Sequence, residues 1–397
     1  MTKGQPMSDA ASRRPTVYDV AQEAGVSIAS VSFAFRRPER ISEATRERVL
    51  AAARRLGYAP SAAARGLANG RTGTLGLHAF DLMLERADPR DVTPPRSDAR
   101  SPLDAASIIP WSQSDDETLA DPRAFPLYVD EVQRGFALEC WMLGRPVMLS
   151  SGSDSDVSVA DTAGRVDGLA IFPSPVLPAA LLRMPATIPT VLFSVAPGDD
   201  PHHRVRVDNA GGMSALIDHL VGDHQYDDVA FVGRQEGFDN SERFREYRAS
   251  LMRWGLRPRD EPIDGTVRGP HRMLEQLGAL HVRGALPRVL VCASDQHALM
   301  ALDALAGLGV RVPDEVAVTG FDGILAGRLS TPTLTSVRQP MEAMGRAAAR
   351  ILAGTAGALP DGHARFDAVF APRVVLRRSC GCRSSVSAGY QIPMDAA

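Results

Sequence analysis

Between about residue 74 and residue 353, short apolar runs alternate with amphipathic segments, and this alternation constrains the fold more than any other feature. Seven runs have the length and β-branched content of buried strands: 74–80, 145–150, 166–172, 190–193, 228–233, 288–293 and 316–321. Six segments predict helices: about 127–143, 209–222, 240–254, 271–281, 295–308 and 340–353. The alternation predicts parallel sheets covered on both faces and leaves the number of sheets open.

A different pattern occupies residues 16–57. A first helix is expected between a capping Thr16 and Gly25, because apolar residues recur there at helical spacing and glycine accepts the left-handed conformation of a helix end. Ser27 is placed to cap a second helix and Ser42 a third, which ends at Gly57. Three short helices with a tight turn between the first two are typical of helix-turn-helix units, although other small three-helix units share this spacing.

Charge divides the chain unevenly. Residues 1–74 hold twelve Lys/Arg and six Asp/Glu, a local balance of +6, whereas the whole chain has a net charge of −3. A basic head on an acidic body predicts a polyanionic partner for the head alone. We find no apolar run of about 18 residues and no apolar core of a secretory signal, so we expect a cytoplasmic protein without a membrane span.

Cysteines and histidines show no familiar spacing. Four cysteines among 397 residues do not predict a disulfide framework, and we expect reduced thiols. Cys380-Gly381-Cys382 lacks the second pair of ligands that a structural zinc site requires, so we expect surface thiols and neither metal nor cofactor. The nine histidines lack H-x-x-x-H and H-E-x-x-H spacing, and nucleophile-elbow and phosphate-loop motifs are missing, which argues against an enzyme.

The stretch from Thr16 to Ala68 resembles the DNA-binding head and hinge of the LacI/GalR family of bacterial transcription regulators. The resemblance rests on the D-V-A-x-x-A-G-V-S core (19–27), S-x-x-T-R (42–46), L-G-Y-x-P (56–60) and a hinge leucine. It implies phosphate contacts from short polar donors and two tyrosines: Tyr18, Ser27, Ser30, Ser32, Ser42, Thr45 and Tyr58. The serines are also ordinary helix caps, which is compatible with phosphate contact.

The same resemblance implies that Ile28, Ala29 and Phe33 face the bases, where apolar side chains can contact thymine methyl groups. An aromatic at position 33 could instead belong to the core or to a dimer contact. Leu67 and the adjacent Ala64 would enter the minor groove from paired hinge helices. In the hinge, Ser61 replaces the asparagine that is frequent in the family.

Residues beyond the hinge resemble the effector domain of this family, which consists of two Rossmann-like lobes with a ligand between them. The implied domains are a disordered lead-in (1–14), a helix-turn-helix domain (15–59), a hinge helix (60–70), an effector-binding and dimerisation domain (71–380) and a tail (381–397). By position, lobe one would comprise about 74–208 and 340–367, and lobe two 209–338 and 368–380. The predicted fold is thus a small all-α head joined to a two-lobed α/β domain with parallel sheets.

The resemblance assigns effector contacts to Arg243, Asp322, Ser294, Asp295 and Ser194. Guanidinium donors and ionised carboxylate acceptors suit ligand hydroxyl groups. Alternatives remain: Arg243 as a surface helix charge, Asp322 as a turn residue, and Asp295 as a helix N-cap.

Residues 85–126 depart from the family pattern. They contain seven prolines, nine acids and five arginines, which predicts a long loop or disorder. The segment is either a solvated insertion or a lid over the ligand, anchored by Ile108–Trp111.

Together these features predict a homodimeric, ligand-controlled repressor that binds a near-palindromic DNA operator and takes a carbohydrate effector. A solute-binding protein without DNA function and a Rossmann-like enzyme are the alternatives. The sequence leaves open the identity of the effector, whether it releases or tightens DNA binding, the operator and the choice between dimer and tetramer.

Overall fold

The computed structural model describes residues 15–58, 71–79, 127–151, 156–172, 188–235, 237–264, 270–357 and 365–382. The chain divides into two compact units, Met1–Thr72 and Gly73–Ala397. The predictions for the lead-in, for the hinge with Ser61, Ala64 and Leu67, and for the insertion 85–126 lie outside the described residues.

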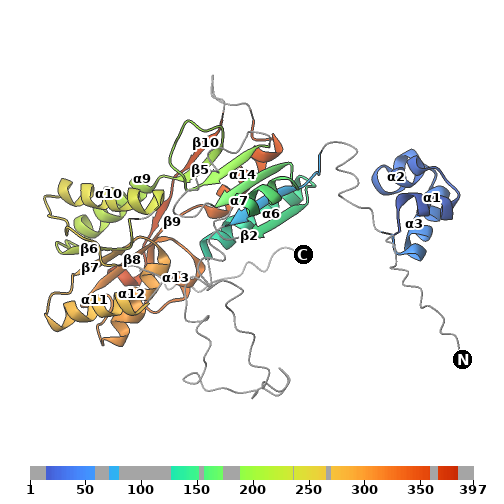
Figure 1. Ribbon diagram of the computed structural model, residues 1–397. Coiled ribbons are helices and arrows are strands. Elements are labelled where there is room, and N and C mark those ends of the chain that lie inside the picture. The colour runs from blue at the N-terminus through green and yellow to red at the C-terminus, as the bar shows by residue number, and fades with distance from the viewer. Residues whose placement is uncertain are drawn as a thin grey trace, which may run out of the picture. The chain divides into compact units, whose positions relative to one another are not determined.

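The first unit contains α1 (Val17–Ala24), α2 (Ile28–Arg36), a short 3-10 helix (Pro38–Arg40) and α3 (Glu43–Leu56) (Figure 1). Thr16 and Asp19 form a reciprocal capping box at the start of α1, and Gly25 ends it at φ +64°. Ser27 and Ser42 cap α2 and α3. The inward face of each helix forms one core with Val20, Val31 and Val49 at its centre, so the helix-turn-helix prediction is confirmed.

The second unit contains a six-stranded parallel sheet in the order β10-β5-β4-β3-β1-β2 (Figure 1). Its strands are β1 (Leu75–Ala79), β2 (Val147–Ser151), β3 (Gly168–Phe172), β4 (Thr190–Phe193), β5 (His203–Val207) and β10 (Asp367–Phe370). Alternate residues of the strands face opposite sides. Ala170 and Phe172 share a core with α6 (Leu127–Met142) and α14 (Met341–Ala353), whereas Leu169 and Ile171 face α7 (Asp156–Ala163).

A five-stranded sheet follows in the order β11-β9-β8-β7-β6. Its strands are β6 (Val229–Val232), β7 (Val289–Cys292), β8 (Ala317–Asp322), β9 (Thr335–Arg338) and β11 (Arg373–Val375), the last antiparallel to β9. One face packs against α9 (Asn209–Asp218), its π-helical extension η6 (His219–Asp223) and α10 (Phe238–Arg253); the other packs against α11 (Pro270–Val282) and α12 (Asp295–Gly307). The short helices α13 (Leu325–Leu329) and η7 (Arg378–Cys380) complete this part.

The chain passes from the first sheet to the second after β5, returns after β9, and crosses again after β10. The seven predicted strands are present, but the sequence pattern missed β5, β9, β10 and β11. These strands carry charged or polar residues, such as Arg204 in β5 and Ser336 in β9, which become buried only in the folded sheet. The lobe boundary expected at residue 367 is wrong: β10 pairs with β5, so the crossing lies after Phe370.

None of the helices that the structure describes has the length and apolar character needed to cross a membrane.

Candidate functional sites

The first candidate site is the outer face of the head. Helix α2 buries Val31 and Ala34, and Ile28 and Ala29 lie on its exposed side. Tyr18 of α1 is 66% exposed. Phe33 is half-buried, and the aromatic side chain of α2 that packs against the head core is Phe35. The core interpretation of Phe33 is therefore not supported, and its ring remains near the surface.

The polar positions of this face lie at helix starts. The Ser27 hydroxyl accepts the Ser30 N–H at 3.1 Å and lies 3.0 Å from the Ser30 hydroxyl. Ser42 and Thr45 repeat the arrangement on α3, with their hydroxyls 2.9 Å apart. Ser32 is half-buried on α2, and Tyr58 packs against Phe35 with ring centroids 6.1 Å apart. The exposed caps are thus confirmed, and their hydroxyls lie beside helix N-termini that favour anions.

The second candidate site is a buried polar cluster in the second unit, centred on Arg243 of α10. The side chain is only 3% exposed, so the interpretation as a surface charge is wrong. Its Nε donates to Asn209 Oδ1 at 2.8 Å and its Nη1 donates to the Ala293 carbonyl at 2.7 Å. The guanidinium lies 3.8 Å from the centroid of the Phe321 ring. These contacts hold the Arg243 guanidinium group in one orientation before any ligand binds.

Two carboxylates flank this guanidinium. Asp322 Oδ1, at the end of β8, lies 3.5 Å from Arg243 Nη1, and Asp239 Oδ2 of α10 lies 3.7 Å from Nη2. Asp322 has φ +119°, a rare conformation outside glycine that accumulates at functional sites. Burial raises the pKa of Asp322, and the Arg243 charge opposes the shift. Gln339 donates to Asp322 Oδ1 at 2.7 Å, and its own Oε1 is buried without a donor among the described residues.

Ser294 and Asp295 follow β7 but have different roles. Ser294 is the N-cap of α12, accepting the His297 N–H, so the expectation of Asp295 as the cap is wrong. Asp295 is fully buried and accepts from the Ile324 N–H at 2.7 Å and from the Ser336 hydroxyl at 2.5 Å. Burial, followed by the charge of Asp322, raises the pKa of Asp295. Its contacts hold the loop that follows β8 and so position Asp322.

Ser194 directly follows β4, has φ +57° and is half-buried. It therefore belongs to the carboxyl edge of the first sheet, together with Tyr128 of α6, whose ring meets Phe172 edge-on at 5.9 Å. Burial, followed by the charge of Asp239, raises the pKa of Tyr128. Tyr128 and Ser194 thus offer hydroxyl groups at the carboxyl edge of the first sheet.

The sequence did not reveal Tyr128, Asn209, Asp239 and Gln339. Gln339 directly follows β9, and Asn209 begins the helix after β5. Both residues lie where the chain crosses between the sheets at the ends of strands, and ligands bind at such places in open α/β folds. Strand-end position could have indicated them, but β5 and β9 were themselves missed. Chemically, the cluster offers a fixed guanidinium, carboxylates and an amide oxygen, which suits a polar, uncharged ligand with several hydroxyl groups.

Comparisons with known proteins match both units. Residues 16–61 match the model of bacterial regulatory proteins of the lacI family, and residues 217–380 match the periplasmic binding protein-like domain. Catabolite control protein A of Priestia megaterium is 26% identical over 348 residues, covering 85% of this chain and 91% of that protein. The regulator CelR of Thermobifida fusca is 29% identical over 356 residues, covering 86% of this chain and 91% of that protein.

Among solved structures, the lac repressor dimer bound to operator and the anti-inducer ONPF is similar with a TM-score of 0.67 and 21% identity, covering 93% of this chain and 99% of that one. The complex of the regulator CelR with cellobiose is similar with a TM-score of 0.54 and 23% identity, covering 92% of this chain and 100% of that one. At these identities the structural likeness shows a shared fold, in which a helix-turn-helix head precedes a two-lobed α/β domain.

Proposed function

Because the chain combines a DNA-binding head of the lacI family with a periplasmic binding protein-like domain, we propose that it is a repressor whose affinity for operator DNA is set by a small molecule bound at the Arg243–Asp322 cluster. The observation that carries this proposal is the cluster itself. A guanidinium and a carboxylate that are both buried would be costly to retain in an apolar interior, so a site that recognises polar ligand atoms explains them better than fold stability does.

On the DNA side, the exposed face of α2 would enter the major groove, with Ile28, Ala29 and Phe33 against the bases. The capped serines, Tyr18, Thr45 and Tyr58 would contact phosphates and set the docking register. In the hinge, Leu67 with Ala64 would enter the minor groove as an apolar wedge and kink the DNA, and Ser61 would be a further DNA-binding position. The lac repressor relative was solved as a dimer on its operator, which supports a homodimer on a near-palindromic site for this chain.

On the ligand side, we infer a carbohydrate or a related polyol. The structure of CelR was solved with cellobiose, and a sugar would place several hydroxyl groups near the groups described above. Asp322 and the Gln339 Oε1 atom would accept ligand O–H groups, and Arg243 would donate to ring or hydroxyl oxygens. Ser194 and Ser294 would contribute hydroxyls from the strand ends. Binding would favour one arrangement of the two sheets and thereby shift DNA affinity.

Deleting residues 1–72 should abolish sequence-specific DNA binding, because every proposed base contact lies in this unit. The measurement is a gel shift of the full chain and of 73–397 against DNA fragments flanking the gene, at physiological salt with random competitor. The full chain should bind a preferred fragment at least about 10³-fold tighter than random DNA. A full chain without such preference would contradict the repressor proposal and favour a solute-binding protein.

Replacing the thymines opposite Ile28 and Phe33 by uracil should weaken operator binding by about 1 kcal/mol per base pair or more, because each replacement removes a methyl group that these side chains would contact. Fluorescence anisotropy titrations of the two operators measure the difference. Uracil at a position outside the contacted bases is the control. Equal affinities would mean that Ile28 and Phe33 pack the protein and read no bases.

A further inference from the structure

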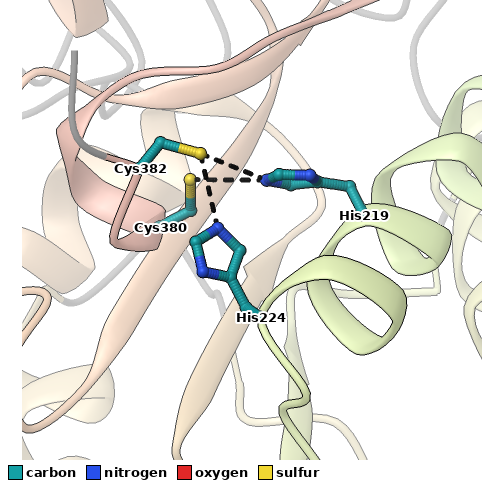
Figure 2. A group of neighbouring side chains, drawn as sticks. All are labelled: His219, His224, Cys380 and Cys382. Atoms are coloured by element: carbon teal, nitrogen blue, oxygen red, sulfur yellow. Dashed lines mark hydrogen bonds between the residues drawn. The ribbon is translucent and has the colours of Figure 1, made fainter. Parts of the chain in front are cut away.

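Four potential metal ligands meet on the second unit, away from the Arg243 cluster. His219 begins η6 and His224 directly follows it, whereas Cys380 ends η7 and Cys382 lies two residues further on (Figure 2). One ligand atom from each side chain lies within 4.8 Å of all the others. The sequence pattern reveals only the C-x-C pair, because the two histidines lie far from it in the chain.

The backbone explains how both histidines reach the same point. Residues five apart on an α-helix point about 140° away from each other. Here the helix widens to a π-turn, closed by the His224 N–H donating to the His219 carbonyl at 3.4 Å, and this turn brings the two imidazoles onto one side. Isolated π-turns accumulate at functional sites.

The cysteine side is shaped by Gly381, which has φ +95° and turns the chain between the two thiols. A Cβ at this position would lie 2.9 Å from the Tyr226 hydroxyl, so the turn requires glycine for space as well as for conformation. Tyr226 donates to the Cys380 carbonyl at 3.0 Å and stacks on the His224 ring with centroids 5.2 Å apart. The Thr335 hydroxyl lies 3.0 Å from Cys380 Sγ.

Asp223 orients one of the imidazoles. Its Oδ2 lies 2.7 Å from His219 Nδ1, which makes Nδ1 the protonated nitrogen and leaves the Nε2 lone pair directed at the two sulfurs. A carboxylate behind a histidine ligand is the usual outer-shell arrangement of zinc sites.

We propose that His219, His224, Cys380 and Cys382 form a structural site for a tetrahedral divalent cation of the zinc class. Bond lengths of about 2.3 Å to sulfur and 2.0–2.1 Å to nitrogen place N and S ligands about 3.6 Å apart in a tetrahedron. Nε2 of His219 lies 3.8 Å from Cys380 Sγ and 3.4 Å from Cys382 Sγ, and His224 Nε2 lies 3.3 Å from Cys382 Sγ. The existing positions thus approximate the edges of the coordination polyhedron.

Two soft thiolates and two imidazoles select zinc over magnesium or calcium, which prefer oxygen ligands. Both thiols release their protons to solvent on binding, and the two thiolates then balance the charge of the cation. Four protein ligands leave no open position, which is characteristic of structural rather than catalytic sites.

The position of the site suggests what the metal stabilises. The metal would tie the segment after the third crossing to the C-terminal end of α9. The first residue of α9, Asn209, lies about 15 Å from that end along the helix and accepts a hydrogen bond from Arg243. The metal site does not depend on the identity of the effector or of the operator.

The test uses the full chain, reduced and freed of metal by chelator, and titrated with Co²⁺. We expect one equivalent to bind with a near-ultraviolet thiolate-to-cobalt charge-transfer band and strong visible bands of tetrahedral cobalt, both removed when Zn²⁺ displaces it. Zn²⁺ should also raise the Tm of the metal-free chain. Cys382→Ser and His224→Gln, at half-buried positions, should lose the cobalt spectrum and the Tm increase, whereas His281→Gln, an exposed control, should keep both.

Asp223→Asn should weaken Zn²⁺ binding by about 10–100-fold, as is usual for an outer-shell carboxylate, and the exposed Asp227→Asn should leave it unchanged. Circular dichroism establishes that each variant is folded; if Cys382→Ser does not fold, His224→Gln provides the same comparison. Thiols that are hydrogen-bonded to the histidines without a metal would give a folded, reduced chain with no charge-transfer band. That result, or a band that survives His224→Gln, would overturn the proposal.

Discussion

Arg243→Met is expected to abolish the response of the DNA complex to effector and to lower the free energy of unfolding by about 3–5 kcal/mol, the usual cost of breaking a buried ion pair from one side. Methionine retains much of the apolar stem but removes the donors to Asn209 and to the Ala293 carbonyl. It also leaves Asp322 and Asp239 without their common counter-charge.

The matched control for this variant is Arg245→Met on the same helix. The Arg245 side chain is 69% exposed and pairs with Glu242 at the surface, so its loss should cost within about 0.5 kcal/mol. Urea unfolding measures stability, and gel shifts with a panel of sugars measure the response. An Arg243→Met protein as stable as Arg245→Met, which still responds to effector, would contradict the assignment of Arg243 to the ligand site.

The second large effect concerns pH. Burial raises the folded-state pKa values of Asp295 and Asp322 above the usual 3.8. Between 3.8 and the raised values, the folded chain keeps protons that the unfolded chain has released, so the stabilising contribution of these groups is complete below 3.8 and is lost as pH rises through the folded values. Unfolding free energy should therefore decline from pH 3.8, the unfolded value, to about pH 7, the folded value of Asp295, through these two groups.

Glu139 acts in the opposite direction. A hydrogen bond from Arg350, and a further one from Arg346, lower its pKa, so its contribution is present above the unfolded value and is lost as pH falls. Its buried carboxylate accepts from both arginines at 2.7 Å and links α6 to α14. The decline of unfolding free energy with rising pH that we assign to Asp295 and Asp322 must therefore be isolated by mutation.

Asp295→Asn should reduce the decline of stability with rising pH, because the replacement cannot titrate, while Asp303→Asn on the exposed side of α12 should leave it unchanged. Urea unfolding at a series of pH values gives the slope of unfolding free energy against pH for each variant and for the wild-type chain. Identical slopes for the wild-type chain and Asp295→Asn would show that Asp295 is already ionised across this range.

Local sequence patterns predicted the head and the skeleton of the second unit. Thr16, Ser27 and Ser42 cap the three helices, and the seven apolar runs are strands, because capping and hydrophobic periodicity act within a few residues of the chain. Patterns missed β5 and β9, since Arg204 and Ser336 are polar residues whose burial depends on partners elsewhere. Arg204, for example, donates to the carbonyls of Ala196 and His202 and pairs with Asp200.

The candidate sites divide in the same way. Sequence resemblance selected Arg243 and Asp322 but could not show that the arginine is buried, that Asp295 supports the loop after β8, or that Gln339 reaches Asp322 from β9's end. The prediction that Cys380 is a surface thiol is wrong, because η7 packs against the second sheet and leaves Cys380 fully buried.

By itself, the sequence determined the class of the fold, the helix-turn-helix head and the partners that the family resemblance implies, because these depend on local spacing and on motifs read in order. Only the tertiary structure decided which distant side chains meet. His219 and Cys382 are separated by 163 residues, yet their ligand atoms lie 3.4 Å apart. The physical reason is that sheet pairing and the crossings between sheets, rather than neighbouring residues, set the distances on which charge pairing and metal coordination depend.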